Sequence, residues 1–170
     1  MDLSRHIRSI PDFPKPGIIF RDITPLLADA NAFRAAIDAM AKEVKKNNAD
    51  VVVGIDARGF IFASAIAFKL NKGLVIARKA GKLPYKTMSV KYSLEYASHE
   101  LEMHEDAITP GTRAVVVDDV LATGGTAKAA ATLVEQLGGT VANIIFLIEI
   151  EGLKGREELK KYSTHSLLIY

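Results

Sequence analysis

Apolar residues recur along the chain in two alternating patterns, short unbroken runs and longer stretches with helical spacing. The short runs are rich in β-branched residues, which is typical of strands buried on both faces. These predicted strands are Val51–Ile55, Leu74–Ala77, Val115–Val117 and Ile144–Ile148. The longer stretches predict helices at Asn31–Lys46, Phe60–Leu70 and Ala127–Leu137. Strands that alternate with helices predict an α/β fold, with a mostly parallel central sheet flanked by helices.

Two segments break this alternation. Residues 10–25 contain four of the six prolines, so this stretch is predicted to be irregular and to pack as an N-terminal hood, about residues 1–25, over the rim of the sheet. In residues 80–105 apolar and polar side chains alternate, for example over Tyr92–Tyr96, which predicts a β-hairpin arm inserted between core strands. Its place after Arg78-Lys79 favours a lid over the alternative, a plain surface hairpin.

Size and composition restrict the class of protein. A chain of 170 residues with 49% apolar and 25% charged residues predicts one globular domain, 1–170, that includes hood and arm. A net charge of +2, from 22 basic and 20 acidic residues, argues against a nucleic-acid partner. The absence of cysteine excludes disulfides and thiolate metal sites. No apolar run reaches membrane-spanning length and no signal-peptide pattern is present, so we expect a cytoplasmic protein with no membrane partner.

The most informative segment begins where the run Val115–Val117 meets two adjacent carboxylates, Asp118 and Asp119. A short loop with the sequence Thr-Gly-Gly-Thr separates them from the next predicted helix, which Thr126 is placed to cap. The two glycines allow backbone amides to converge on an anion at the helix N-terminus. Two carboxylates would repel a phosphate unless they hold sugar hydroxyls, for which they are pure acceptors. The segment therefore predicts a sugar-phosphate site; the alternative is a tight turn with two solvated aspartates.

Charged residues also follow two other predicted strands. Asp56 to Arg58, Arg78-Lys79 and Asp118-Asp119 are all expected just beyond the end of a strand. Because ligands of parallel sheets gather at the carboxyl ends of the strands, these three charged loops predict one site at one rim.

Residues 113–126 resemble the phosphoribosyl-pyrophosphate signature of type I phosphoribosyltransferases, in which apolar positions precede Asp-Asp and then Ala-Thr-Gly-Gly-Thr. Further segments are similar to the adenine-specific branch of that family and occur in the expected order over nearly the whole chain. They are Phe13–Pro25, Asp56–Phe60, Arg78–Pro84, Tyr92–Tyr96 and Leu153–Glu157. Two departures are small: Ala97 stands where glycine usually follows Leu-Glu-Tyr, and Ala57 stands where some members have serine.

The resemblance implies a type I phosphoribosyltransferase fold and a pentosyl transfer in purine salvage. The 5-phosphoribosyl group of 5-phosphoribosyl 1-pyrophosphate would pass to adenine, giving AMP and pyrophosphate. The implied cofactor is Mg²⁺, held mainly through substrate and water and not directly by the protein, and the implied assembly is a homodimer. Two alternatives remain open on the sequence: a regulator that binds the same ligand without catalysis, and a transferase for another base.

The resemblance also implies roles for individual residues. The residues implied to bind 5-phosphoribosyl 1-pyrophosphate are Arg21, Asp56, Ala57, Arg58, Arg78, Lys79, Lys82, Asp118, Asp119, Ala122, Thr123, Gly124, Gly125 and Thr126. Those implied to bind adenine are Ile19, Phe20 and Tyr96, and those implied to act in catalysis are Glu95, Arg58, Asp118 and Asp119.

Within this set, the loop that ends at Thr126 would hold the ribose 5-phosphate, and the acidic pair would hold the ribose hydroxyls. Residues 56–58 would form the pyrophosphate loop, which in this family often contains a non-proline cis peptide. Arg78 is expected to reach the site of a partner subunit, and Glu95 with Tyr96 would close over the reacting centre. On pattern alone, Phe20 is equally readily an ordinary core aromatic, and Glu95 belongs to a solvated strand face.

Overall fold

The computed structural model describes residues 1–94 and 97–170, and it divides into two compact units, Met1–Ala39 and Met40–Tyr170. The division falls inside helix α2 (Ala30–Lys46), which matches the helix predicted from Asn31. The prediction of a single domain over the whole chain stays a prediction.

The first unit is built around a small antiparallel hairpin. Its elements before α2 are the 3-10 helix η1 (Leu3–His6), strands β1 (Arg8–Ile10) and β2 (Phe20–Asp22), and helix α1 (Thr24–Ala28). The loop between the strands is irregular, as predicted, and contains a cis peptide at Phe13-Pro14. The prediction was wrong from Phe20 onward, because Phe20 pairs with Ile10 and begins a regular strand. Its role as a hood over the sheet stays a prediction.

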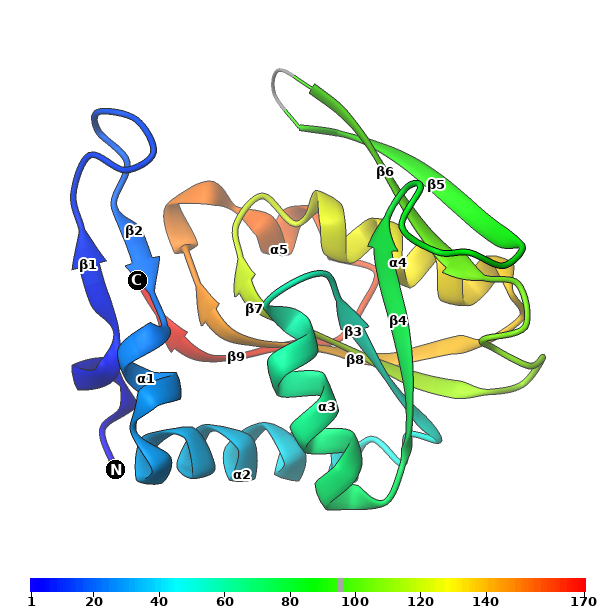
Figure 1. Ribbon diagram of the computed structural model, residues 1–170, viewed down its shortest axis with the longest axis horizontal. Helices are drawn as coiled ribbons and strands as arrows, with labels where there is room; N and C mark the ends of the chain where they lie inside the picture. Colours follow the sequence, from blue (N-terminus) through cyan, green and yellow to red (C-terminus); the bar gives the residue numbers. More distant parts are fainter. Residues whose placement is uncertain (95–96) are drawn as a thin grey trace. The chain divides into compact units, whose positions relative to one another are not determined.

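The second unit contains, among its described residues, a seven-stranded sheet in the order β5-β6-β4-β3-β7-β8-β9 (Figure 1). The strands are β3 (Val51–Ile55), β4 (Gly73–Lys79), β5 (Thr87–Leu94), β6 (Ala97–His104), β7 (Arg113–Leu121), β8 (Thr140–Glu149) and β9 (Thr164–Ile169). The run from β4 to β9 is parallel throughout, whereas β5 and β6 pair antiparallel with each other and β6 pairs antiparallel with β4. The predicted mostly parallel α/β sheet is therefore confirmed.

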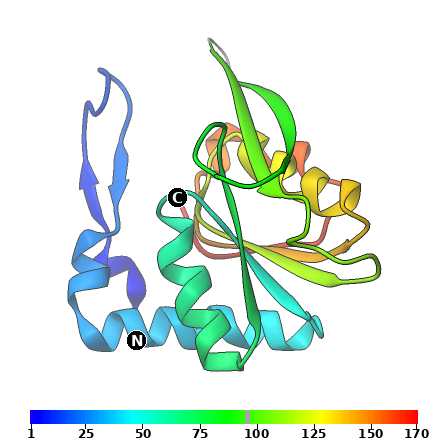
Figure 2. The same cartoon turned by 45° about the vertical axis from the view of Figure 1, so that its right-hand side comes forward.

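Helices cover both faces of this sheet (Figures 1 and 2). They are α3 (Gly59–Leu70), α4 (Gly125–Gln136), the 3-10 helix η2 (Glu151–Leu153) and α5 (Gly155–Glu158). Residues of α4, among them Leu133, form one buried cluster with Val53, Val116 and Phe146 of the sheet. Burying side chains of this size stabilises the fold by about 1.5–3 kcal/mol each, so this cluster fixes α4 and the loop before it.

β4, β7 and β8 are longer than their apolar runs predicted, and in β4 and β7 the added residues include predicted site residues. β7 continues through Asp118 and Asp119, and β4 continues through Arg78 and Lys79, so these residues lie inside strands and not beyond them. The reason is that backbone pairing continues: Asp118 is in register with Phe146 of β8. A third correction concerns Thr126, because α4 begins at Gly125 and its N-cap is Gly124.

The predicted hairpin arm is confirmed in the described part of the chain. β5 and β6 pair antiparallel over their full length, and the hairpin extends beyond the edge of the parallel strands (Figure 2). Glu95 and Tyr96 lie outside the described residues. Within the described ranges, none of the helices has both the length and the apolar character needed to cross a membrane.

Candidate active site

The acidic pair occupies the end of β7 that faces the start of α3. Asp119 is only 4% exposed, and its Oδ2 atom lies 2.9 Å from Nε of Arg58. The backbone amide of Asp119 donates a hydrogen bond of 2.9 Å to Oδ1 of Asp118. Gly59, at the first turn of α3, makes this approach possible, because a Cβ atom there would lie 2.8 Å from Asp118 Oδ1.

Burial changes the acidity of both carboxyl groups. It raises the pKa of Asp118 well above its ordinary value, and the negative charge of Asp119 raises it further. Burial also raises the pKa of Asp119, although Arg58 opposes that rise. The ionised form of two such close carboxyl groups is stabilised by any ligand that donates hydrogen bonds to them or brings positive charge near them.

The loop from Ala122 to Thr126 connects this pair to the N-terminus of α4. Gly124 adopts φ +88°, a left-handed conformation, and a Cβ atom there would lie 2.6 Å from the Gly155 carbonyl oxygen. The loop and the first turn of α4 line an open cavity of about 150 Å³, together with Asp118 and Phe146. Free backbone amides at a helix N-terminus favour an anion, so this cavity suits a phosphate group.

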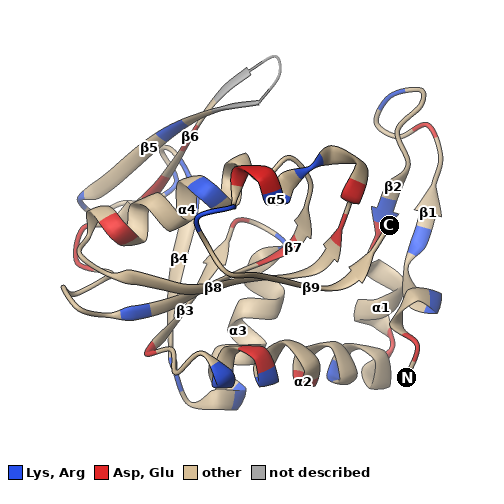
Figure 3. Cartoon of the chain, turned by 180° about the vertical axis from the view of Figure 1, so that it is seen from behind, with Lys and Arg blue, Asp and Glu red and all other residues tan. Residues whose placement is uncertain are grey.

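A second segment, η2 and α5, supports that loop from behind. A side chain at Gly155 would collide with the Ala122 carbonyl oxygen, so only glycine allows α5 to pack this closely. Arg156 donates two hydrogen bonds of 2.7 Å to the Glu149 carboxylate at the end of β8. Basic and acidic residues also meet between α4 and α5, where Lys128 and Glu158 form an ion pair of 2.6 Å (Figure 3).

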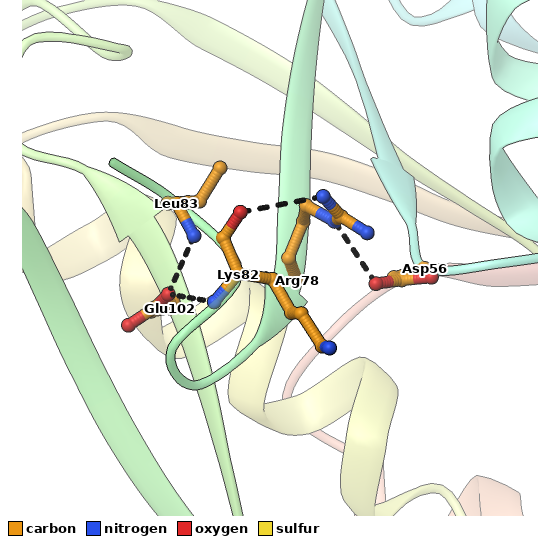
Figure 4. Close-up of polar contacts among 5 residues, drawn as sticks. All are labelled: Asp56, Arg78, Lys82, Leu83 and Glu102. Atoms are coloured by element: carbon orange, nitrogen blue, oxygen red, sulfur yellow. Dashed lines mark hydrogen bonds and ion pairs between the residues drawn. The ribbon is translucent and has the colours of Figure 1, made fainter. Parts of the chain in front are cut away.

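The loop after β3 carries Asp56, Ala57 and Arg58, and its Asp56-Ala57 peptide is cis, as the family resemblance implied. Oδ2 of Asp56 accepts a hydrogen bond of 3.0 Å from Nε of Arg78 on β4. Nη1 of Arg78 also donates to the carbonyl oxygen of Lys82, at 3.3 Å (Figure 4). Hydrogen bonds of Arg78 therefore link the loop after β3, the end of β4 and the turn that follows β4.

These segments meet around one open cavity of about 430 Å³. Its lining includes eight residues singled out from the sequence: Asp56, Ala57, Arg58, Lys79, Asp118, Asp119, Ala122 and Thr126. Tyr92, His99 and Leu101 of the arm also line the cavity and were not predicted from the sequence. The rings of Tyr92 and His99 stack at 5.7 Å between centroids. The alternation along the arm placed Tyr92 and Leu101 on strands, but it did not show which face meets the cavity.

The remaining predicted residues lie in other parts of the chain. Ile19, Phe20 and Arg21 belong to the first unit, where the rings of Phe20 and Phe13 meet edge to face at 5.3 Å. Ile19 is exposed there, and Arg21 donates a hydrogen bond to the Ser9 hydroxyl. Glu95 and Tyr96, which the resemblance places over the reacting centre, lie outside the described residues.

Together, the geometry provides three chemical functions at one edge of the sheet. The loop before α4 presents amides to an anion, the acidic pair presents acceptors for hydroxyl groups, and Arg58 and Lys79 add positive charge beside a cavity. A ligand that carries hydroxyls and more than one phosphate would satisfy all three.

Comparisons with known proteins agree with this geometry. Residues 24–169 match the family model of the phosphoribosyl transferase domain. The chain is 54% identical to the adenine phosphoribosyltransferase of Pseudothermotoga lettingae over 170 residues, all of both chains. It is also similar to the crystal structure of adenine phosphoribosyltransferase from Thermoanaerobacter pseudethanolicus, with 49% identity and a TM-score of 0.96 over 99% of this chain and 98% of that one.

A third similar protein has been solved with ligands. It is adenine phosphoribosyltransferase from Saccharomyces cerevisiae, complexed with D-2,5-dideoxy-2,5-imino-altritol 1,6-bisphosphate and adenine. The identity is 36% and the TM-score 0.94, over 98% of this chain and 96% of that chain.

Proposed function

Because the chain belongs to the phosphoribosyl transferase family, and within it to the adenine phosphoribosyltransferases, we propose that it transfers the 5-phosphoribosyl group of 5-phosphoribosyl 1-pyrophosphate to adenine. The products are AMP and pyrophosphate. The observation that carries the proposal is that one cavity is lined by both the acidic pair and the loop residues Ala122 and Thr126. The yeast relative, which binds a bisphosphate and adenine, supports the same ligand pair.

In this reaction a ring nitrogen of adenine forms a bond to the anomeric carbon of the ribose, the bond from that carbon to pyrophosphate breaks, and the proton of that nitrogen is released with the pyrophosphate. Positive charge develops on the sugar ring and negative charge on the leaving group. Asp118 and Asp119 hold the ribose hydroxyls and stabilise the positive charge, and the amides of residues 122–126 hold the 5-phosphate. Burial raises the pKa values of both carboxyl groups, whereas hydrogen bonds from the substrate hydroxyls and nearby positive charge favour the ionised form that the reaction needs.

Pyrophosphate is held on the other side of the cavity. Amides of the Asp56-Ala57-Arg58 loop, with the side chains of Arg58, Arg78, Lys79 and Lys82, supply donors and positive charge to the leaving group. Arg58 has a second role beside Asp119, whose charge it partly balances in the free enzyme.

Magnesium fits the oxygen donors of this site only in part. Within the described residues no group of three or more His, Cys, Asp or Glu side chains could hold a metal ion, and we assign the metal no direct protein ligand. Bound mainly through substrate hydroxyls, pyrophosphate and water, Mg²⁺ would supply positive charge for the leaving group.

Adenine recognition and closure rest on the segments outside this cavity. Phe20 stacks on the base and Ile19 offers it backbone groups, while Arg21 contacts 5-phosphoribosyl 1-pyrophosphate. Glu95 and Tyr96 close over the reacting centre, which excludes water from a reactive sugar cation. The enzyme works as a cytoplasmic homodimer in which Arg78 reaches the partner's site.

One assay tests the proposal. Purified protein is incubated with 5-phosphoribosyl 1-pyrophosphate, magnesium and adenine, with guanine, hypoxanthine and xanthine in parallel, and nucleotide products are separated by chromatography. AMP formation with little product from the other bases is expected. Equal rates with adenine and hypoxanthine would refute the choice of base, and the absence of any nucleotide would refute the transferase.

A further inference from the structure

Glu102 is a buried carboxylate that the proposed reaction does not use. It lies on β6 with 6% of its surface exposed, in register with Arg78 of β4. Its Oε1 atom accepts hydrogen bonds from the backbone amides of Lys82 and Leu83, each at 3.1 Å. Its Oε2 atom accepts a weaker one from the Thr87 hydroxyl at 3.4 Å. Burying a carboxylate is costly unless it is hydrogen-bonded, and these three donors offset that cost.

The turn that Glu102 holds carries a cation of the proposed pyrophosphate site. It follows β4 directly, and Gly81 reverses the chain with φ +81°. Figure 4 shows a continuous series of contacts from Glu102 through the Lys82 backbone to Arg78 and Asp56. In that view the ammonium group of Lys82 extends away from the Glu102 carboxylate.

We propose that Glu102 is a positioning residue that holds the Lys82–Leu83 turn in its pyrophosphate-binding conformation, an inference that rests on the proposed function. By accepting two consecutive amides, the carboxylate fixes the peptide groups on both sides of Lys82. This directs the Lys82 carbonyl oxygen to the Arg78 guanidinium, which in turn is bonded to Asp56 in the loop after β3. Glu102 therefore acts on the leaving-group side of the reaction without contacting the substrate.

The two carboxylate oxygens of Glu102 have different partners, which allows its role in the turn to be distinguished from a general contribution to stability. Among the described residues, Oε1 accepts its hydrogen bonds from the amides of the turn, whereas Oε2 accepts one from the Thr87 hydroxyl at the start of β5. Replacing Glu102 by glutamine keeps an amide oxygen that can accept both backbone hydrogen bonds, whereas replacing it by alanine removes the acceptor. If the role is to hold the turn, glutamine should rescue what alanine loses.

The test compares Glu102→Ala and Glu102→Gln with the matched control Glu100→Ala. Glu100 lies on the same strand, and its carboxylate bonds only the exposed Ser89 hydroxyl among the contacts resolved, at 2.6 Å. We expect Glu102→Ala to raise the KM for 5-phosphoribosyl 1-pyrophosphate roughly tenfold, equivalent to the loss of about one hydrogen bond, with the KM for adenine nearly unchanged. Glu102→Gln and Glu100→Ala should stay close to wild type. If Glu102→Ala does not fold, Glu102→Asp, which withdraws the carboxylate by one methylene, serves instead.

A double variant tests whether the effect passes through the turn. In a Lys82→Ala background, Glu102→Ala should raise that KM by clearly less than in wild type, because the turn then carries no ammonium group for the lost hydrogen bonds to misplace. Additive effects, an equally defective Glu102→Gln, or equal rises in both KM values would overturn the proposal. Titration of each variant with inorganic pyrophosphate and Mg²⁺ in a calorimeter measures binding without turnover. It therefore separates a failure of this inference from a wild-type protein that makes no AMP.

Discussion

At the scale of single residues, Asp118 combines a structural cost with a functional gain. Its raised pKa means that the folded chain holds the proton more tightly than the unfolded chain does. Stability is therefore lost as the pH rises from the ordinary value of 3.8 through the folded value, and the cost is full above it. A neutral side chain of the same shape would remove that cost.

We therefore expect Asp118→Asn to raise the free energy of unfolding at pH 7, by on the order of 1 kcal/mol, and to lower kcat/KM about 10- to 100-fold. Each kcal/mol corresponds to roughly 2–4 °C in Tm for a chain of this size. The gain in Tm should vanish as the pH falls below 3.8, where the aspartate of the wild type is as neutral as the asparagine of the variant. Asp106→Asn, which changes an exposed carboxylate, is the control. A Tm at pH 7 below that of wild type would contradict the expectation.

At the scale of elements, the close packing of α5 shapes the phosphate loop. Gly155→Ala places a methyl group against the Ala122 carbonyl, so the loop must move. We expect a loss of about 1–3 kcal/mol in stability and a higher KM for 5-phosphoribosyl 1-pyrophosphate. Gly152→Ala is a matched control in η2, because a Cβ atom there meets nothing within 4 Å. Thermal unfolding and steady-state kinetics of both variants decide the question, and equal behaviour would exclude this packing role.

The contact between α5 and β8 gives a pH-dependent prediction. Burial, the largest single influence, raises the pKa of Glu149, but hydrogen bonding to Arg156 and Ser166 and the positive charge of Arg156 together outweigh burial and lower the pKa. The stabilising contribution is thus present above the ordinary value of 4.5 and is lost as the pH falls through the lower folded value. Because Arg156 is 47% exposed, we expect Arg156→Ala to cost only about 1–2 kcal/mol at pH 7.

This cost should shrink in unfolding measurements as the pH falls from 4.5 through the lower folded pKa of Glu149, at which the folded carboxylate becomes protonated. Lys160→Ala, an exposed neighbouring cation, should leave Tm unchanged at both pH values. A cost for Arg156→Ala that stays constant with pH would assign its effect to side-chain packing.

Elements also show how far sequence reasoning reached. The spacing of apolar residues predicted α2, α3 and α4 to within two residues at each end, because each helix has a long stretch of apolar residues. It ended β7 too early, since Asp118 is polar but still pairs with Phe146 of β8 through its backbone, and the strand continues through Asp119 to Leu121. The end of a strand is determined by its backbone hydrogen bonds to the neighbouring strand, and the pattern of apolar residues does not show these.

At the scale of the whole molecule, the cavity combines strands that are distant in sequence. The rule that ligands gather at the carboxyl ends of parallel strands was enough to bring Asp56 and Asp118 together. It did not predict that β6 pairs with β4, and so it missed Tyr92, His99 and the turn held by Glu102. Those residues depend on the register of an antiparallel edge, which no local pattern specifies.

The homodimer is the prediction that concerns the largest scale. A two-fold dimer is the commonest closed oligomer, and light scattering should give twice the chain mass of 18.4 kDa. Within one chain Arg78 is hydrogen-bonded to Asp56, so its expected action across subunits needs a separate measurement.

Arg78→Ala and the double variant Asp118→Asn, Asp119→Asn should each be nearly inactive. After co-expression, a heterodimer has one site with intact aspartates and an intact Arg78 from its partner, so activity should return if Arg78 acts across the interface. Activity no higher than in either parent would show that Arg78 serves its own chain, where its bonds to Asp56 and Lys82 already place it.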